Sequence, residues 1–287
     1  MPLWVSQYPV SEPTRVLPDE ETWAEMASAL ALAGFALVYG RVDDWEPDEA
    51  VDGEPGSLDR VLGAEAERYR EIGHPEVRRR FAASRLLLRY AAGMAVGAEP
   101  EQFEIARHPN GRPYLRGCDQ VEVSISHTGR IVVAGISRLG PIGVDVESVE
   151  RPMDRAELAE LVCSPYESEV LRGLPQRDRE NYLVRLWTLK EAYSKALGLG
   201  MRLSFRAFGF DLEPEGPTAR LMQFDGEVGD GEQWAFESHN LEGRYAVGLA
   251  VTQGVFGGTR DTLASTMLDS GLLATVLSAT QDADPDG

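Results

Sequence analysis

The chain has 287 residues, of which 43% are hydrophobic and 26% charged, a composition that excludes fibrous, disordered and membrane-spanning proteins. This length allows one large domain or two of about 140 residues each. The 28 basic residues stand against 47 acidic ones, and the formal charge of −19 argues against nucleic acid and anionic membranes as partners. An anionic ligand must therefore meet a local basic cluster.

Cysteine usage and the N-terminal sequence lead us to expect a cytoplasmic protein. Cys118 and Cys163 are the two cysteines, and their spacing fits neither a metal site nor a disulfide framework. Residues 1–15 lack the basic and apolar regions of a signal peptide. The best apolar run, 27–39, is shorter than the roughly 20 residues that cross a bilayer. We expect the protein to stay in the cytoplasm.

Helices and strands are predicted throughout the first half of the chain. Its first predicted elements are a strand at 3–5, a helix at 19–32, a strand at 35–39 and an acidic loop at 43–57. Apolar residues at helical spacing then predict a basic amphipathic helix at 75–97. Most of its arginines are expected on a solvated face: Arg78, Arg79, Arg80, Arg85 and Arg89. Short β-branched runs predict strands at 103–106, 121–126, 131–137 and 142–147.

The order of helix and then strands occurs again after Gly140-Pro141. The second set comprises helices at 154–162, 165–174 and 179–197 and strands at 208–212, 234–237 and 245–252. This repetition predicts an α+β fold made of two similar halves. The proposed divisions are a first half at 1–139, a second half at 140–257, and a partly disordered C-terminal extension at 258–287 with a helix at 263–277 and an acidic tail at 281–287.

Lysine is almost absent from the sequence. Only Lys190 and Lys195 occur, and every other basic residue counted above is an arginine. A chain that uses arginine this widely is expected to keep lysine where a compact ammonium with a movable proton does what a guanidinium cannot. Chance placement of two remaining lysines is the alternative.

Two carboxylates in the predicted strand 142–147 are candidate metal ligands. Asp145 and Glu147 are two residues apart, so they project from one face, while Val144 and Val146 project from the other. Carboxylates so placed repel each other unless a cation lies between them, and Mg²⁺ binds through one or two carboxylates together with substrate phosphates. The alternative is a solvent-facing edge of an ordinary alternating strand.

The predicted helix that ends at Gly198 carries three polar or aromatic residues on one face. Trp187, Glu191 and Lys195 recur every four residues. A surface ion pair would explain Glu191 and Lys195, and a place in the core would explain Trp187, which is the reading we prefer for it. The functional reading makes Glu191 a third metal-side carboxylate or a general base, with Lys195 neutralising a leaving phosphate.

Two further segments offer groups that bind phosphate. Ser126 and His127 follow an alternating strand and precede Gly129, where the backbone can approach a ligand closely. Arg107 and Arg112 lie in a basic turn that is either a plain hairpin loop or a source of charge-assisted contacts to phosphate. The motifs of P-loop NTPases, Rossmann folds, zincins and α/β-hydrolases do not occur.

Taken in order, four motifs resemble the Sfp-type 4'-phosphopantetheinyl transferases. They are GRPYL at 111–115, SISHTGR at 124–130, IGVDVE at 142–147 and WTLKEAYSKALGLG at 187–200. The resemblance is clear over residues 78–209. It implies two α+β halves in a pseudo-twofold arrangement, with coenzyme A in the cleft between them, and a monomeric protein.

The resemblance also implies a reaction. The phosphopantetheine arm of coenzyme A passes to a serine of an apo acyl or peptidyl carrier protein, as in polyketide or nonribosomal peptide biosynthesis, and adenosine 3',5'-bisphosphate is released. The nucleophile belongs to the carrier, so no Ser-His-Asp or Cys-His set is needed in this chain. Two alternatives are a non-catalytic module that binds coenzyme A and a Mg²⁺-dependent phosphohydrolase that cleaves coenzyme A or a nucleotide.

The resemblance assigns roles to eight residues, and the basic turn adds Arg107. It implies Mg²⁺, or alternatively Mn²⁺, on Asp145, Glu147 and Glu191, with Glu191 also a candidate base. Lys195 would assist the leaving phosphate and contact coenzyme A. The remaining coenzyme A contacts are Arg85, Arg107, Ser126, His127 and Arg112, which stands where the family commonly has lysine.

Overall fold

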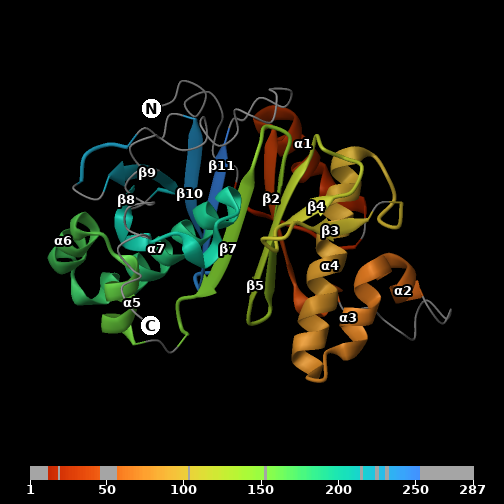
Figure 1. Cartoon of the computed structure of the whole chain (residues 1–287), viewed down its shortest axis with the longest axis horizontal. Helices are drawn as coiled ribbons and strands as arrows, with labels where there is room; N and C mark the ends of the chain where they lie inside the picture. Colours follow the sequence, from red (N-terminus) through yellow and green to blue (C-terminus); the bar gives the residue numbers. More distant parts are fainter. Residues whose placement is uncertain are drawn as a thin grey trace, which may run out of the picture.

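The computed structural model describes residues 12–252 except 19, 46–56, 103, 152–153, 214–215, 224–225 and 230–232. It is a mixed α+β structure (Figure 1). The helices are α1 (Ala24–Ala33), α2 (Ser57–Leu62), α3 (Ala66–Glu71), α4 (Pro75–Val96), α5 (Arg155–Val162), α6 (Pro165–Gly173) and α7 (Gln176–Leu197). The strands are β1 (Thr14–Arg15), β2 (Phe35–Arg41), β3 (Ile105–Arg107), β4 (Pro113–Leu115), β5 (Glu122–Thr128), β6 (Ile131–Ser137), β7 (Ile142–Ser148), β8 (Phe208–Leu212), β9 (Thr218–Gln223), β10 (Trp234–Leu241) and β11 (Tyr245–Thr252).

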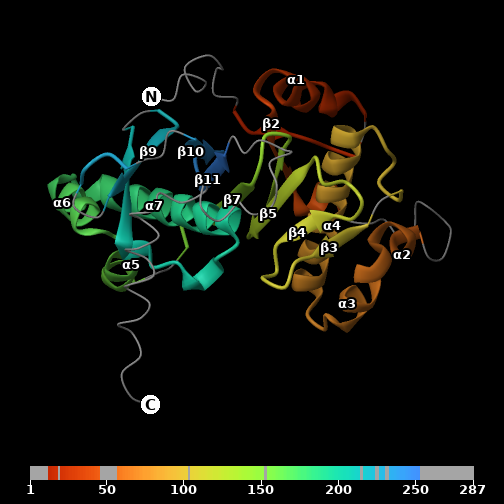
Figure 2. The same cartoon turned by 45° about the horizontal axis from the view of Figure 1, so that its top comes forward.

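The strands form two main sheets, each covered by one long helix. The first sheet has the order β1-β2-β6-β5 and the second the order β7-β11-β10-β9-β8, while β3 and β4 pair as a separate hairpin. Helix α4 lies on the outer side of the first sheet and α7 on the outer side of the second (Figures 1 and 2). Strands β5 and β7, which belong to different sheets, lie side by side where the sheets meet.

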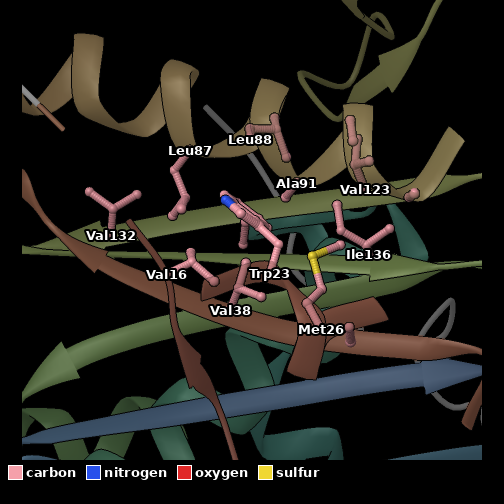
Figure 3. Close-up of a cluster of buried hydrophobic side chains, with 14 of the residues drawn as sticks. Val16, Trp23, Met26, Val38, Leu87, Leu88, Ala91, Val123, Val132 and Ile136 are labelled. Carbon is pink, nitrogen blue, oxygen red and sulfur yellow. The ribbon is translucent and has the colours of Figure 1, made fainter. Parts of the chain in front are cut away.

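Strand alternation divides the core into layers. In β2, Phe35 and Leu37 join a cluster that also holds residues of β7, β10 and β11, whereas Val38 faces the opposite way, toward α4. Leu87 and Leu88 of α4 reach down to the first sheet in that second cluster (Figure 3). Because both faces of these strands are buried, their sequences are nearly continuous apolar runs.

Two glycines let α7 lie unusually close to the second sheet. A Cβ added to Gly143 of β7 would overlap the carbonyl oxygen of Ala192, and one added to Gly248 of β11 would overlap the backbone of Thr188. This close backbone contact sets the distance between α7 and β7. Any side chain at residue 143 must push the helix away.

The Gly143→Ala variant is therefore expected to lose about 1–3 kcal/mol of unfolding free energy, because the new methyl group meets rigid backbone. Urea denaturation measures the loss. Gly173→Ala is the matched control, since Gly173 has no atom within 4 Å of an added Cβ. Equal stability of the two variants would contradict the close-packing explanation.

The structure confirms most of the predicted elements and corrects several. The helix predicted at 75–97 is α4, which ends at Gly97 in a left-handed conformation, φ 71°. Sequence analysis did not predict β1, α2, α3, β4 or β9. Residues 43–45 of the predicted acidic loop belong to a 3₁₀ helix at Val42–Trp45. The predictions at 3–5, 46–56 and 258–287, including the helix at 263–277 and the tail at 281–287, lie outside the described residues.

Two arginines of α4 are not on a solvated face. Arg85 and Arg89 are only 5% and 2% exposed. Arg89 donates hydrogen bonds to the carbonyl oxygens of Leu62 and Pro100, so it ties the end of α2 to the loop after α4. Burial of these two cations is possible because backbone and side-chain oxygens surround them.

Candidate active site

Strand β7 holds both predicted carboxylates on its α7 face. Asp145 and Glu147 are 8% and 6% exposed, while Val144 and Val146 point into the cluster between the sheets, as the alternation predicts. Their burial means that each carboxylate must be balanced by donors or cations close by. The donors come from β5 and the cations from two different segments.

Asp145 joins three elements. Its Oδ1 accepts a hydrogen bond from Ser126 Oγ of β5 at 2.7 Å and one from Lys195 Nζ of α7 at 2.7 Å. Lys195 also donates to the carbonyl oxygen of Val144 at 3.0 Å. The structure thus brings together residues from three of the four motifs.

Glu147 has a separate set of partners. Its Oε1 accepts from Thr128 Oγ1 at 2.7 Å, and its Oε2 forms an ion pair with Arg151. The pairs Ser126–Asp145 and Thr128–Glu147 are spaced two residues apart on each strand, so β5 presents one hydroxyl to each carboxylate. The sequence did not suggest Arg151, because its contact depends on the turn that follows β7.

Glu191 lies next to Asp145 without sharing its hydrogen bonds. Burial raises the pKa of the Glu191 carboxyl, the negative charge of Asp145 raises it further, and Lys195 acts in the opposite direction. Three ionisable groups therefore meet at one point between α7 and β7. Burial, the largest of these causes, disfavours the charged form of Glu191.

The carboxylates have the oxygen donors that a hard divalent cation requires, and Asp145 and Glu191 have the mutual repulsion that such a cation relieves. As they stand, they do not form a closed ligand set: within the described parts of the chain no cluster of three His, Cys, Asp or Glu side chains is arranged for a metal ion. Lys195 forms an ion pair with Asp145, and Arg151 forms one with Glu147. The donor chemistry of the carboxylates fits a metal ion.

His127 lies among positive charges at the end of β5. The pKa of this exposed imidazole is lowered, first by partial desolvation and then by Arg80, with smaller effects from Arg85 and Lys195. Lys195, which pairs with Asp145, thus also lowers the pKa of His127. The carboxylates of β7 therefore lie close to the positive charges around His127. An anion bound there would meet the His127 imidazole and the positive charges of Arg80, Arg85 and Lys195.

Arg85, one of the positive charges near His127, is buried. Its guanidinium lies over the Phe81 ring at 4.6 Å and donates from Nε to Glu65 Oε1 at 2.8 Å. Glu65 also faces Arg107 Nη2 at 3.7 Å, and its other oxygen is buried without a hydrogen-bond partner. The sequence missed Glu65 because the short helices around it lack a clear periodic pattern.

The basic turn between β3 and β4 reaches the end of α7. Asn110 Nδ2 donates to the carbonyl oxygen of Gly198 at 2.9 Å, and Gly111 takes the φ of 86° that closes the turn. Arg112 pairs with Glu122 at 2.7 Å, and its buried Nε has no partner. The hydrogen bond of Asn110 thereby joins the turn that precedes the first motif to the end of the fourth.

Lys190, the other lysine, is not in this cluster. Its Nζ is completely buried and bonds Glu167 Oε2 at 2.5 Å and the carbonyl oxygens of Val162, Phe205 and Phe208. Four oxygens around one compact ammonium explain why arginine does not replace it. Of the two lysines, one therefore serves the fold and one lies in the candidate site.

Trp187 shares the helix face of Glu191 but packs against the core. It is partly buried and meets Phe205 edge to face, with the ring centroids 5.8 Å apart. The structural reading preferred for Trp187 is confirmed.

Comparison with known proteins matches two segments of the chain to family models. Residues 141–250 match the model of the 4'-phosphopantetheinyl transferase superfamily, and residues 45–137 match the model described as 4'-phosphopantetheinyl transferase, N-terminal. Similar proteins include 4'-phosphopantetheinyl transferase HetI of Nostoc sp., 30% identical over 63% of this chain and 77% of that protein.

Two Bacillus proteins are also similar to this chain. The 4'-phosphopantetheinyl transferase psf-1 of Bacillus pumilus is 30% identical over 65% of this chain and 78% of its own length. The 4'-phosphopantetheinyl transferase Sfp of Bacillus subtilis is 25% identical over 53% and 67%, respectively. Together, the two family matches and these relatives show that the chain belongs to the 4'-phosphopantetheinyl transferase superfamily.

Proposed function

We propose that the protein transfers the 4'-phosphopantetheine group of coenzyme A to a serine of an apo acyl or peptidyl carrier protein and releases adenosine 3',5'-bisphosphate. The observation that carries the proposal is the meeting of three motif segments through the hydrogen bonds Ser126–Asp145 and Asp145–Lys195, while Asn110, which directly precedes the remaining motif, bonds Gly198. Membership of the superfamily supports the same reaction.

We propose a pseudo-twofold arrangement of two halves, 1–139 and 140–257, with the ligand cleft between them. The sheet orders β2-β6-β5 and β7-β11-β10 support it, because in both the first strand lies beside the last strand of a hairpin. Along the chain, each half also has a strand, then helices, and then two hairpins. The two family matches meet between residues 137 and 141, close to the proposed boundary.

Asp145, Glu147 and Glu191 would hold Mg²⁺, or alternatively Mn²⁺, against the pyrophosphate of coenzyme A. When bound, the metal supplies positive charge that stabilises the phosphate oxygens. Lys195, whose Nζ lies beside Asp145, would donate to the phosphate that leaves. The raised pKa of Glu191 suits a carboxylate that accepts the proton of the carrier serine.

The phosphates of coenzyme A would lie on the basic side of the site. Ser126 and His127 would contact them from β5, and Arg107 and Arg112 from the hairpin. Arg85 is buried behind Glu65, so we assign its charge, rather than a direct contact, to the binding of coenzyme A. Together these groups position the ligand, which is the main demand of a reaction whose nucleophile belongs to the partner.

The lowered pKa of His127 leads to a testable result. The free imidazole is neutral near neutral pH, and a bound phosphate favours its protonated form, so we expect the pKa to rise when coenzyme A binds. Because binding raises the pKa, the affinity for coenzyme A should increase as the pH falls from above the pKa of the bound imidazole to below that of the free one. NMR titration of the ring, with pantetheine as the phosphate-free control, measures the shift, and an unchanged pKa would contradict contact with phosphate.

We further propose that the protein acts as a monomer in the cytoplasm, in polyketide or nonribosomal peptide biosynthesis. Both cysteines, Cys118 and Cys163, are unpaired thiols, which suits a reducing compartment. Among the helices that the structure describes, none is long and apolar enough to cross a membrane.

The release of adenosine 3',5'-bisphosphate separates this function from the alternatives. The transferase should form it from coenzyme A only when an apo carrier is present. A phosphohydrolase would cleave coenzyme A without a carrier, and a binding module would form no product in either case. Chromatography of the nucleotides, with and without a panel of apo carriers, distinguishes the three.

A further inference from the structure

Glu65 contacts two arginines from segments that are distant in the sequence. It is the last residue of the 3₁₀ helix Gly63–Glu65, directly before α3. Its Oε1 accepts the 2.8 Å hydrogen bond from Arg85 Nε of α4 and lies 3.7 Å from Arg107 Nη2 of β3. The Glu65 side chain is only 12% exposed. One largely buried carboxylate therefore lies between two arginines that the proposed function assigns to coenzyme A.

The surroundings of Glu65 are basic. The guanidiniums of Arg85 and Arg68 lie over the ring of Phe81, at 4.6 and 5.6 Å from its centroid. Burial lowers the pKa of the Arg107 guanidinium, and the charges of Arg85 and Arg68 lower it further, whereas Glu65 acts in the opposite direction. The carboxylate thus balances cations that would otherwise repel one another.

The other hydrogen bonds of the two arginines hold each of them to its own segment. Arg107 donates from Nη1 to the carbonyl oxygen of Gly111 at 2.7 Å, within the β3–β4 hairpin. Arg85 donates from Nη1 to Ser84 Oγ at 3.2 Å, within α4. Glu65 contacts both arginines, so the position of one guanidinium relative to the other depends on it.

The arginines of Glu65 lie near the side of the site to which we assign the phosphates. Burial lowers the pKa of His127, and Arg85 is one of the cations that lower it further. A phosphate that contacts His127 is therefore also within the electrostatic influence of Arg85. This step rests on the binding of coenzyme A proposed above.

The second oxygen of Glu65 distinguishes it from a carboxylate that serves the fold. Glu167 is completely buried, and both of its oxygens accept hydrogen bonds: Oε2 from Lys190 and Oε1 from the backbone N–H of Phe210. Glu65 Oε2 is buried and has no hydrogen-bond partner among the described residues. A buried acceptor of this kind costs free energy of folding and requires an explanation beyond stability.

We propose that Glu65 is a positioning residue for coenzyme A, whose carboxylate holds the guanidiniums of Arg85 and Arg107 in the arrangement that the phosphates of the ligand require. Two guanidiniums against one carboxylate leave positive charge for an anion. Cations that are already held in place lose less conformational freedom when the ligand binds. Loss of this positioning should weaken the binding of coenzyme A without slowing the transfer step once the ligand is bound.

Two conservative variants of the full chain separate position from charge. Glu65→Asp keeps the charge but withdraws the carboxylate by one methylene group, and we expect the Kd and the KM for coenzyme A to rise about 10–100-fold with kcat unchanged. Glu65→Gln keeps an acceptor in place but loses the balancing charge, so the rise should be smaller. Isothermal titration calorimetry with coenzyme A and initial rates measure these values. Glu67→Asp, at an exposed position of α3, is the matched control and should change neither value.

A merely structural role of Glu65 would give a different result, because loss of folded protein lowers the apparent kcat and leaves the KM unchanged. An unchanged KM in Glu65→Asp would overturn the proposal. Tighter binding of coenzyme A by Glu65→Gln than by the unaltered protein would also overturn it, since the negative charge alone would then matter.

The calorimetric measurement needs no carrier, so it separates this inference from the proposed function. Unchanged affinity for coenzyme A in Glu65→Asp, together with normal transfer by the unaltered protein, would refute the role of Glu65 alone. An unaltered protein that binds coenzyme A but transfers nothing to any apo carrier would refute the proposed function.

Discussion

Glu191→Gln is expected to lower the rate of phosphopantetheine transfer by about 10²–10⁴-fold, the range for loss of a catalytic proton acceptor. The variant keeps the shape of the side chain but removes its charge. Since Asp145 and burial already disfavour that charge, stability should not fall, and the melting temperature should stay the same or rise. Initial rates measure the expected loss of transfer, and a thermal melt measures the expected melting temperature.

Asp178→Asn is the matched control for Glu191→Gln. It removes a carboxylate from the exposed first turn of the same helix, and we expect normal transfer. A Glu191→Gln protein that transfers at the normal rate would contradict the role of Glu191. A large loss of stability would instead contradict the view that its charge is disfavoured in the fold.

The two lysines should give opposite results on replacement by methionine. Lys190→Met breaks a fully buried ion pair and leaves Glu167 without its cation, which costs about 3–5 kcal/mol of unfolding free energy. Lys195 is 32% exposed at its side chain, so Lys195→Met should cost much less stability but abolish most transfer. Denaturant titration and initial rates, measured on both variants, give the comparison.

A double variant separates the ion pair from general damage to the core. Lys190→Met with Glu167→Gln removes both charges, so part of the lost stability should return. If Lys190→Met were as stable as the unaltered protein but inactive, Lys190 would belong to the chemistry and the assignment to the fold would be wrong.

Most of the candidate site could be predicted because it depends on short-range periodicity. Asp145 and Glu147 share a face through the two-residue period of a strand, and Glu191 and Lys195 share one through the helical period. Both expectations are confirmed. The same helical geometry separates Lys190 from Lys195 by about 140° around the helix, a signal in the sequence that distinguishes their roles.

The parts that sequence analysis missed depend on contacts between distant segments. Glu65 meets Arg85 across 20 residues, from short helices without a clear apolar pattern. Burial of Arg85 and Arg89 depends on acceptors from other segments, so their helix looks solvated in the sequence. Strands β4 and β9 were missed because their alternation is weak and their partners, β3 and β8, lie across turns.

We expect the cluster between β5, β7 and α7 to transfer phosphopantetheine to a carrier serine. Intact mass of an apo carrier protein, after incubation with coenzyme A, Mg²⁺ and this protein, tests it most directly. We predict a gain of one phosphopantetheine, lost with EDTA, with Glu191→Gln, and when the carrier serine is replaced by alanine. An unmodified mass across a broad panel of carriers, although coenzyme A binds, would contradict the claim.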